Sequence, residues 1–154
     1  MEIADLIRPE AVFANLHATS KKQAVQELAR RAAKLTDLPE RRICDVLIER
    51  ERLGTTGVGH GIAIPHGKLK ELDRLVALFA RLDDPVDFDA IDEQPVDLIC
   101  VLLAPENAGA DHLKALARLS RLLRDQRICH KLRGAESADA LYAVLTESAA
   151  SRAA

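Results

Sequence analysis

The sequence predicts a single α/β domain in which helices sandwich a mixed central sheet, and three observations lead to this prediction. Apolar residues at helical spacing run through 20–54 and return in 111–148, while near-continuous apolar runs typical of interior strands lie between them. Helices, then strands, then helices are the pattern of an α/β sandwich. At 154 residues the chain is long enough to bury a substantial core, so we expect one domain over 1–154.

Two long helices are expected in the first third of the chain. A short helix and then the extended segment AVFANL come before them. Over 20–36, Ser20 is placed as an N-cap and apolar residues follow it at helical spacing. The second helix is expected within 38–54, with Pro39 near its first turn and Gly54 as its C-terminal stop.

Three strands are expected in the middle of the chain. The segment GIAIPH, 61–66, is short and interrupted by proline, which suits a strand end or an edge strand. The apolar runs at 74–82 and 95–104 read as interior strands covered on both faces. Between these two runs, 83–94 reads as a loop or irregular ribbon. The order of the strands in the sheet cannot be read from the sequence.

The last part of the chain reads as helical throughout. The segment DHLKALARLSRLLRD, 111–125, carries leucines along one side. A further helix, 126–134, ends at Gly134. The segment 137–148 begins with Ser137, another candidate N-cap.

Composition excludes several classes of function. The net charge is −2 and aromatic residues make up 3% of the chain, so we expect no nucleic-acid partner. No apolar run approaches the roughly 20 residues of a membrane helix, and the acidic N-terminus is no secretory signal. The three cysteines are far apart and form no CxxC pair, so they read as small buried apolar residues in a reducing compartment. We therefore expect a cytoplasmic protein without direct membrane insertion.

The segment GTTGVGHGIAIPHGKL, 54–69, concentrates five of the chain's seven glycines and two of its five histidines. It contains no GxxxxGK[ST] string, and its G-x-G follows a helix rather than a strand, so neither common phosphate-binding motif is present. A metal site formed by His60 and His66 with His112 or Asp111 is another interpretation of the segment. A spacing of six through glycine and proline matches no known ligand pattern, so no metal and no cofactor are expected.

His66 is the candidate nucleophile of this segment. Pro65 restricts the backbone that enters it, and Gly67 permits a sharp exit or the close approach of another group. A neutral imidazole is a good nucleophile near physiological pH, and clustered backbone N–H groups suit an anion. This arrangement favours a phosphoryl group received on a histidine nitrogen. A histidine that merely bonds a loop carbonyl remains the alternative from the residues alone.

The same segment resembles the active-site signature of the mannitol/fructose-type enzyme IIA (EIIA type-2) domains of the bacterial phosphoenolpyruvate-dependent phosphotransferase system. FDAIDEQPVDLICVLLAPE, 88–106, and DHLKALARLSRLLRD are similar to the nitrogen-regulatory branch of that family. The resemblance extends over a core of about 6–147 and implies the fold of that family, with a phosphorylated histidine at His66.

The resemblance also implies which residues assist His66. The second histidine of the family's site corresponds to His112, which would donate a hydrogen bond to the phosphoryl group. The family's arginine corresponds to Arg50, with Arg52 as a competing candidate, and would add a charge-assisted bond. The remaining phosphoryl oxygens would be met by hydroxyls and glycine amides, for which the candidates are Thr55, Thr56 and Gly61.

The function implied is that of a phosphoryl-transfer protein with a phosphohistidine intermediate. Its partners would be a histidine phosphocarrier protein as the phosphate donor and proteins of nitrogen-related metabolism and ion homeostasis, regulated by its phosphorylation state. One alternative is a stand-alone sugar-specific enzyme IIA that passes phosphate to a separate IIB partner. The other is a binding module whose histidine is never phosphorylated.

Basic residues form a stripe that begins within the leucine-rich segment. Arg118, Arg121 and Arg124 recur every three positions, and Arg127, Lys131 and Arg133 continue the stripe. The usual interpretation is a solvated helix face opposite the leucines, and the alternative is a surface that docks an acidic partner. An acidic cluster opposes duplex DNA binding. Its members are Asp83, Asp84, Asp87, Asp89, Asp92, Glu93 and Asp97.

Overall fold

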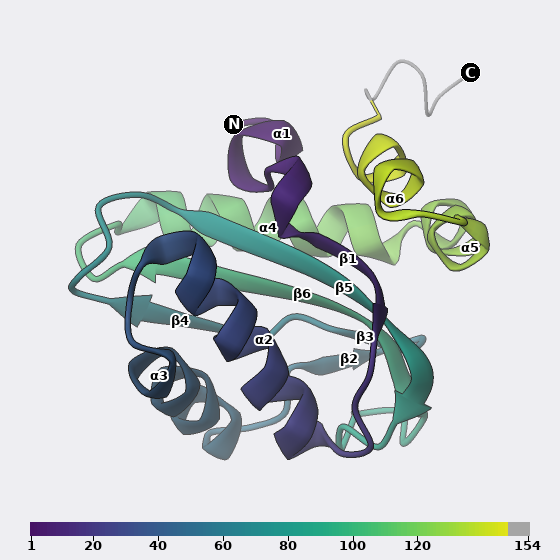
Figure 1. Ribbon diagram of the computed structural model, residues 1–154, viewed down its shortest axis with the longest axis horizontal. Coiled ribbons are helices and arrows are strands. Elements are labelled where there is room, and N and C mark those ends of the chain that lie inside the picture. The colour runs from purple at the N-terminus through teal and green to yellow at the C-terminus, as the bar shows by residue number, and fades with distance from the viewer. Residues whose placement is uncertain (148–154) are drawn as a thin grey trace.

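A computed structural model describes residues 1–147, in which six strands form one mixed sheet with the order β1-β5-β6-β3-β2, and β4 also pairs with β6 (Figure 1). The central pair is β5 (Val76–Val86) and β6 (Val96–Pro105), which run antiparallel. On its outer side, β5 pairs in parallel with β1 (Val12–Leu16). The predicted mixed sheet is therefore confirmed.

Strand β6 is buried along its length, with only Asp97 half-buried. Its near-continuous apolar sequence follows from this position, because helices cover both of its faces and strands flank both of its edges. β5 extends past the predicted strand, through a register shift between Arg81 and Val86. The segment expected to be a loop, 83–94, therefore contributes its first four residues to the sheet.

The proline in GIAIPH divides the strand expected at 61–66 into two. β3 (Ile62–Ala63) and β4 (His66–Leu69) both pair in parallel with β6 and follow one another along its edge. Pro65 lies in the break because it has no N–H to donate, although its carbonyl accepts a hydrogen bond from Leu102 N at 3.0 Å. A further short strand, β2 (Gly57–Gly59), pairs antiparallel with β3 and was not predicted.

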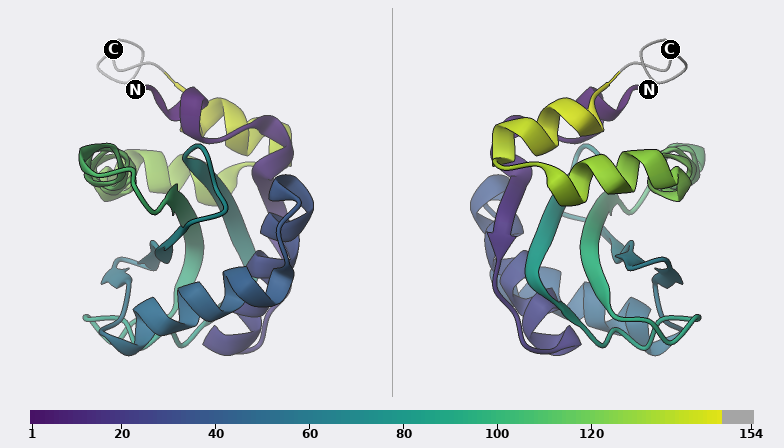
Figure 2. Two further views of the ribbon diagram at one scale, coloured as in Figure 1. Left: turned by 90° about the vertical axis from the view of Figure 1, so that its left-hand side faces the viewer. Right: turned by 90° about the vertical axis from the view of Figure 1, so that its right-hand side faces the viewer.

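Helices lie on both faces of the sheet (Figure 2). One layer contains α2 (Lys21–Thr36) and α3 (Glu40–Arg52). The other contains α1 (Ile3–Leu6), α4 (Ala110–Arg124), α5 (Gln126–Gly134) and α6 (Ala138–Leu145), and a short 3₁₀ helix, Pro9–Ala11, precedes β1. The sandwich predicted from the order of helical and apolar segments is thus the one observed.

The helix ends show the expected capping. The hydroxyl of Ser20 accepts a hydrogen bond from Gln23 N, and that of Ser137 accepts one from Ala140 N, so both predicted N-caps are confirmed. Helix α3 follows Pro39 and ends two residues before Gly54. α6 ends at Leu145, and the last residue of the segment expected to be helical, Ser148, lies outside the described residues.

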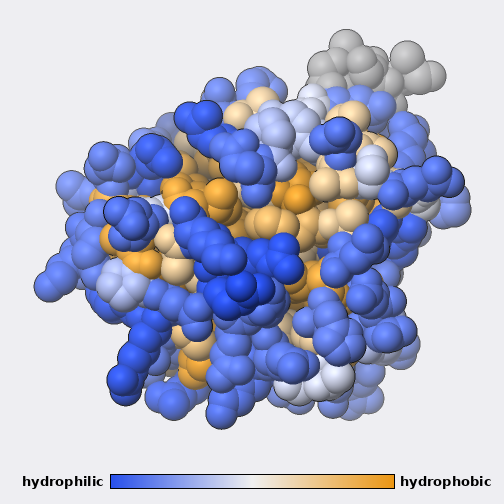
Figure 3. Space-filling model, viewed as in Figure 1, coloured by the Kyte–Doolittle hydropathy of each residue, from blue (hydrophilic) through white to orange (hydrophobic). Residues whose placement is uncertain are grey.

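Apolar side chains from both helical layers and the sheet form one core, in which Phe79, Phe88 and Ile99 are fully buried. On the face shown in Figure 3, apolar side chains extend across the upper middle in an interrupted band, and hydrophilic side chains lie around and between them. The cysteines are free thiols, with Cys100 and Cys129 buried as expected and Cys44 half-buried. Within residues 1–147, no helix combines the length and the apolar character that crossing a membrane requires.

Candidate functional site

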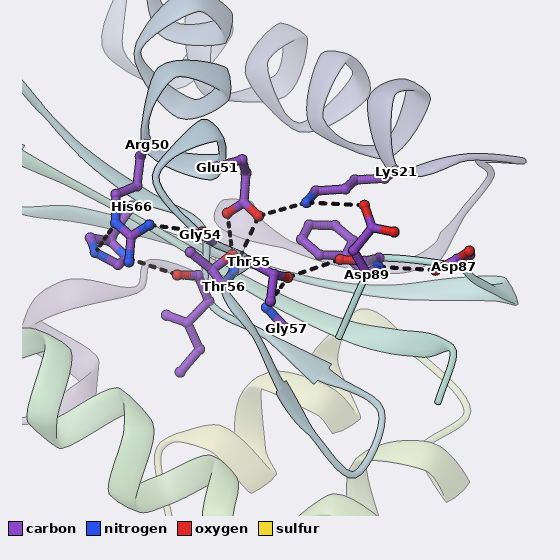
Figure 4. Close-up of polar contacts among 12 residues, drawn as sticks. Lys21, Arg50, Glu51, Gly54, Thr55, Thr56, Gly57, His66, Asp87 and Asp89 are labelled. Carbon is purple, nitrogen blue, oxygen red and sulfur yellow. Dashed lines mark hydrogen bonds and ion pairs between the residues drawn. The ribbon is translucent and has the colours of Figure 1, made fainter. Parts of the chain in front are cut away.

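The fold brings His66, His112 and Arg50 together from three separate elements. His66 is the first residue of β4, Arg50 lies in the last turn of α3, and His112 lies in the first turn of α4. The two imidazole rings have centroids 5.8 Å apart and meet edge to face at 88°. Arg50 Nε lies 3.3 Å from His66 Nε2 (Figure 4).

The register of β4 on β6 explains why His66 and His112 lie close together. His66 pairs with Leu102, three residues before β6 ends at Pro105. The chain then turns and starts α4 at Ala110, so the first turn of α4 returns to the part of the sheet where β4 begins. His112 is therefore delivered by the connection that follows β6, and His66 by the strand beside it.

The hydrogen bonds of His66 define its tautomer. Nδ1 lies 2.9 Å from the carbonyl oxygen of Ile64, which can only accept, so Nδ1 carries the proton. Nε2 then keeps its lone pair and accepts a hydrogen bond from Arg50 Nε. A neutral imidazole with a basic Nε2 at the surface of the site is the form required of a nitrogen nucleophile.

The surroundings of both histidines favour neutral rings. Burial lowers the pKa of His66 below its usual range, and the positive charge of Arg50 lowers it further, whereas the bond to Ile64 and the charge of Glu51 act in the opposite direction. Burial also lowers the pKa of His112, with smaller contributions from His66 and Lys68. At neutral pH, both rings are therefore uncharged.

His112 has an unused polar atom in this position. The residue is only 6% exposed, and its Nδ1 has no hydrogen-bond partner in the described part of the chain. Buried polar atoms are almost always paired, and an orphan at a candidate active site points to a ligand. An added phosphoryl group on the neighbouring His66 would be close enough for this ring to contact it.

Arg50 also joins the nucleophile to the glycine-rich segment, because its Nη1 donates to the carbonyl of Gly54 at 2.9 Å. The competing candidate, Arg52, points elsewhere. It pairs with Glu49 at 3.0 Å, and its side chain is 71% exposed. Of the two arginines in ERER, the structure thus places Arg50 beside His66.

The two threonines of the segment use their hydroxyls within the loop. Thr55 Oγ1 donates to the carbonyl of Phe88 at 2.9 Å and accepts from Gly57 N at 3.0 Å. The N–H of Thr56 donates to Glu51 at 3.1 Å, and its hydroxyl bonds the same carboxylate. Both side chains therefore stabilise the conformation of the loop before β2.

Gly61 is not brought to His66. Its carbonyl accepts from Asp97 N and Leu98 N at the beginning of β6, whereas His66 pairs near the end of that strand. At about 3.3 Å per residue, five residues of nearly extended chain separate the two positions by roughly 16 Å. An amide at Gly61 is thus out of reach of a phosphoryl group on His66.

Glu51 is a residue of the site that sequence reasoning missed. Its side chain is only 6% exposed and bonds Lys21 Nζ at 2.9 Å in addition to both groups of Thr56 (Figure 4). This buried carboxylate ties the end of α3 to the loop before β2 and to the first turn of α2. Within ERER, no composition signal separates Glu51 from the exposed Glu49.

Gly67 allows β4 to lie directly on α3. A Cβ added at Gly67 would lie 2.3 Å from Val46 Cγ1, well inside van der Waals contact. The glycine at this position therefore allows helix α3 to approach strand β4 closely. The contact fixes His66, the preceding residue, against the helix that carries Arg50.

His60 stands apart from these residues. It adopts a left-handed backbone conformation in the turn between β2 and β3, with φ of 57°, and its side chain is exposed. Its N–H donates to Asp92 and its carbonyl accepts from Arg133. Among residues 1–147, no group of three or more histidine, cysteine, aspartate or glutamate side chains is placed to hold a metal ion.

Comparisons with known proteins identify the family of this chain. The family model described as "Phosphoenolpyruvate-dependent sugar phosphotransferase system, EIIA 2" matches residues 5–148. A nitrogen regulatory protein of Bradyrhizobium diazoefficiens is 61% identical over 145 residues, which are 94% of this chain and 95% of the relative. That of Escherichia coli K12 is 40% identical over 149 residues, covering 96% and 91%.

A solved structure supports the same assignment. The crystal structure of nitrogen regulatory protein IIA-Ntr from Neisseria meningitidis matches with a TM-score of 0.88 and 34% identity, over 94% of this chain and 99% of that one. The resemblance stated from the sequence, including its nitrogen-regulatory branch, is confirmed. The chain belongs to the EIIA 2 family of the phosphoenolpyruvate-dependent sugar phosphotransferase system and has the IIA-type phosphocarrier role of that family.

Proposed function

We propose that His66 accepts a phosphoryl group on Nε2 from the phosphohistidine of a small carrier protein, and that its phosphorylation state regulates partner proteins. The observation that carries this proposal is the orientation of the ring. Nδ1–H is held by the Ile64 carbonyl, and Nε2 faces the guanidinium of Arg50. The relatives named as nitrogen regulatory proteins support the regulatory part of the proposal.

The transfer of the phosphoryl group to His66 requires no additional proton carrier. The lone pair of His66 Nε2 forms the new N–P bond, while the N–P bond of the donor breaks and its electron pair returns to the donor imidazole. The proton on His66 Nδ1 stays in place, and the Ile64 carbonyl stabilises the positive charge that the phosphorylated ring acquires. The lowered pKa of His66 keeps Nε2 free of a proton before the attack.

The neighbouring side chains would stabilise the charge that moves during transfer. Phosphoryl transfer spreads negative charge over the equatorial oxygens, so catalysis depends on positioned donors. The guanidinium of Arg50 already lies 3.3 Å from Nε2 and can exchange this contact for a phosphoryl oxygen. The ring of His112, whose Nδ1 is unpaired in the described residues, can donate to another.

A reconstituted relay tests the proposal. The protein is incubated with phosphoenolpyruvate, the first enzyme of the system and its histidine carrier, and the product is analysed by mass and by chemical stability. We expect one phosphate, acid-labile and alkali-stable as a phosphoramidate is, and none on His66→Ala. Incorporation by His66→Ala, or no incorporation by the wild type, would contradict the proposal and favour a binding module that is never phosphorylated.

The description of the family names a sugar phosphotransferase system, and this supports the alternative of a sugar-specific enzyme IIA. Adding a fructose- or mannitol-type IIB to the phosphorylated protein separates the two functions. We expect the phosphate to remain on His66, whereas its rapid loss to the IIB would establish the sugar-specific role.

We place the protein in the cytoplasm, where free thiols such as Cys44, Cys100 and Cys129 stay reduced.

A further inference from the structure

A cavity of about 600 Å³ lies between the β2–β3 hairpin and the junction of α4 and α5. It is separate from the histidine site, because neither His66 nor His112 lines it. Helix α4 starts beside β4 and ends next to α5 (Figure 1). At about 1.5 Å per residue, Ser120 and Arg124 lie roughly 12 and 18 Å along this helix from His112.

The lining of the cavity combines an apolar surface with a few polar groups. Ile62, Leu123 and Cys129 are buried core residues that contribute to its wall, and Val58 of the hairpin is a partly exposed apolar residue beside them. Ser120 and Gln126 add neutral polar side chains. Its volume falls within the range of small-molecule sites, which share this mixture of apolar walls and few polar groups.

Two arginines, Arg124 and Arg133, line the cavity. Within the part of the chain that the structure describes, no aspartate or glutamate belongs to this lining. Arg133 is occupied, because its guanidinium makes two 2.9 Å bonds to Asp97. In the described part of the chain, Arg124 has no ion pair, so its charge is available to a ligand.

The wall formed by the hairpin is fixed before any ligand arrives. Arg133 Nη2 donates to the carbonyl of His60 at 2.8 Å, which fastens the hairpin turn to α5. The N–H of His60 donates to Asp92 at 3.0 Å on the other side of the turn. A preformed wall reduces the ordering that binding requires.

We propose that this cavity binds a small organic anion, with its apolar body against Ile62 and Leu123 and its charged group at Arg124. This site is additional to the phosphocarrier function and does not depend on it. An apolar wall without carboxylates selects against cations, and a cationic guanidinium without a partner selects for a carboxylate or phosphate group. Inorganic phosphate lacks the apolar body and should bind more weakly.

A set of ligands that share a benzene ring but differ in charge, together with inorganic phosphate, tests the proposal. Phenyl phosphate, benzoate, benzyl alcohol, benzylamine and inorganic phosphate are titrated into ¹⁵N-labelled protein, and amide shifts are followed. We expect phenyl phosphate and benzoate to shift amides around the cavity with dissociation constants of about 1 mM. Benzylamine and inorganic phosphate should bind at least tenfold more weakly (about 1.4 kcal/mol). Equal binding of phenyl phosphate and benzylamine, or no shifts at these amides, overturns the proposal.

Variants identify the residue that meets the charge. Arg124→Gln should weaken phenyl phosphate binding by about tenfold, because one charge-assisted contact is lost. Arg121→Gln is the matched control on the same helix, since Arg121 is exposed and does not line the cavity. The affinity of Arg121→Gln for phenyl phosphate should stay within about twofold of that of the wild type. Equal weakening by Arg124→Gln and Arg121→Gln would contradict the proposed binding site. His66→Ala should bind the probe normally, so failure here is distinct from failure of the phosphocarrier proposal.

Discussion

Arg50 is the residue on which the chemistry of His66 most directly depends. Its guanidinium contacts both Nε2 of the nucleophile and the carbonyl of Gly54. Arg50→Ala removes the charge that would meet the phosphoryl oxygens, so we expect the rate of phosphorylation in the reconstituted relay to fall by roughly 10²-fold. Arg50→Lys should recover only part of this loss, because an ammonium cannot hold both contacts in a fixed plane.

Arg52→Ala is the control for this prediction, since Arg52 is exposed and, among residues 1–147, pairs only with Glu49. It should change the rate by less than about twofold, as expected of an exposed ion pair. Equal effects of the two alanine variants would mean that the overall charge at the end of α3 matters, rather than the position of Arg50.

The site residues differ in how far the sequence could predict them. His66, His112 and Arg50 follow from motif positions, and the structure places them together. Glu51 was missed because its burial depends on Lys21 and Thr56, which reach it only after α2 and the loop have packed. Gly61 was grouped with His66 because the register of β3 and β4 on β6 has no local signal in the sequence.

At the scale of elements, Glu51 holds the end of α3 to the loop that precedes β2. Its carboxylate is almost fully buried and accepts from Lys21 and from both donors of Thr56. Glu51→Gln keeps the shape but removes the charge and leaves an N–H₂ group facing donors. We expect a loss of about 2 kcal/mol in the free energy of unfolding, measured by urea denaturation.

Glu49→Gln provides the comparison on the same helix. Glu49 is 72% exposed and has Arg52 as its one ion-pair partner in the described part of the chain, so its substitution should change stability by less than about 0.5 kcal/mol. If Glu51→Gln were as mild as Glu49→Gln, the buried contacts of Glu51 would contribute nothing to holding the loop.

The contact of β4 with α3 gives a prediction about packing. In Gly67→Ala, the new methyl group would overlap Val46 Cγ1, which lies 2.3 Å from the ideal Cβ position. The Val46 side chain must rotate or the strand and helix must move apart, and we expect a loss of about 1–3 kcal/mol in unfolding free energy. Adding Val46→Ala should make room for the methyl group, so the double variant should be less destabilised than the sum of the single changes.

Gly134→Ala tests whether this effect is specific to the packed position. Apart from its chain neighbours and the backbone of its own helix, no atom of residues 1–147 lies within 4 Å of a Cβ added at Gly134, which is the last residue of α5. Alanine should therefore be neutral or slightly stabilising there. A similar loss at both glycines would show that backbone freedom, rather than the contact with Val46, explains the cost.

The elements themselves show which parts of a fold a sequence can predict. The long helices and β6 were predicted because their periodicity or apolar character is local, and the N-caps of α2 and α6 were predicted because a capping residue is a local signal as well. β2 and the break at Pro65 were not, since strands of two or three residues are too short to show a period. Their pairing with one another and with β6 is decided by contacts between distant parts of the chain.

For the whole molecule, the two neutral histidines make stability depend on pH. Burial lowers the pKa of His66 and of His112 in the folded protein, whereas the unfolded chain titrates near the ordinary value of about 6.5. Below that pH, the unfolded state binds more protons than the folded state, so acid favours unfolding. Stability should therefore be complete above about pH 6.5 and decline as the pH falls toward the lowered values of the folded protein.

Urea unfolding at pH 7.5 and pH 5.5 measures this decline, and the double variant His66→Gln, His112→Gln isolates its cause. The variant should lose less stability between the two pH values than the wild type, because two groups with lowered pKa values have been removed. Carboxylates with lowered pKa values, such as Glu27 and Asp92, act at more acidic pH, since unfolded carboxylates titrate near about 4. An equal loss in both proteins would therefore show that the folded state does not keep these two imidazoles neutral, and with them the nucleophilic form of His66.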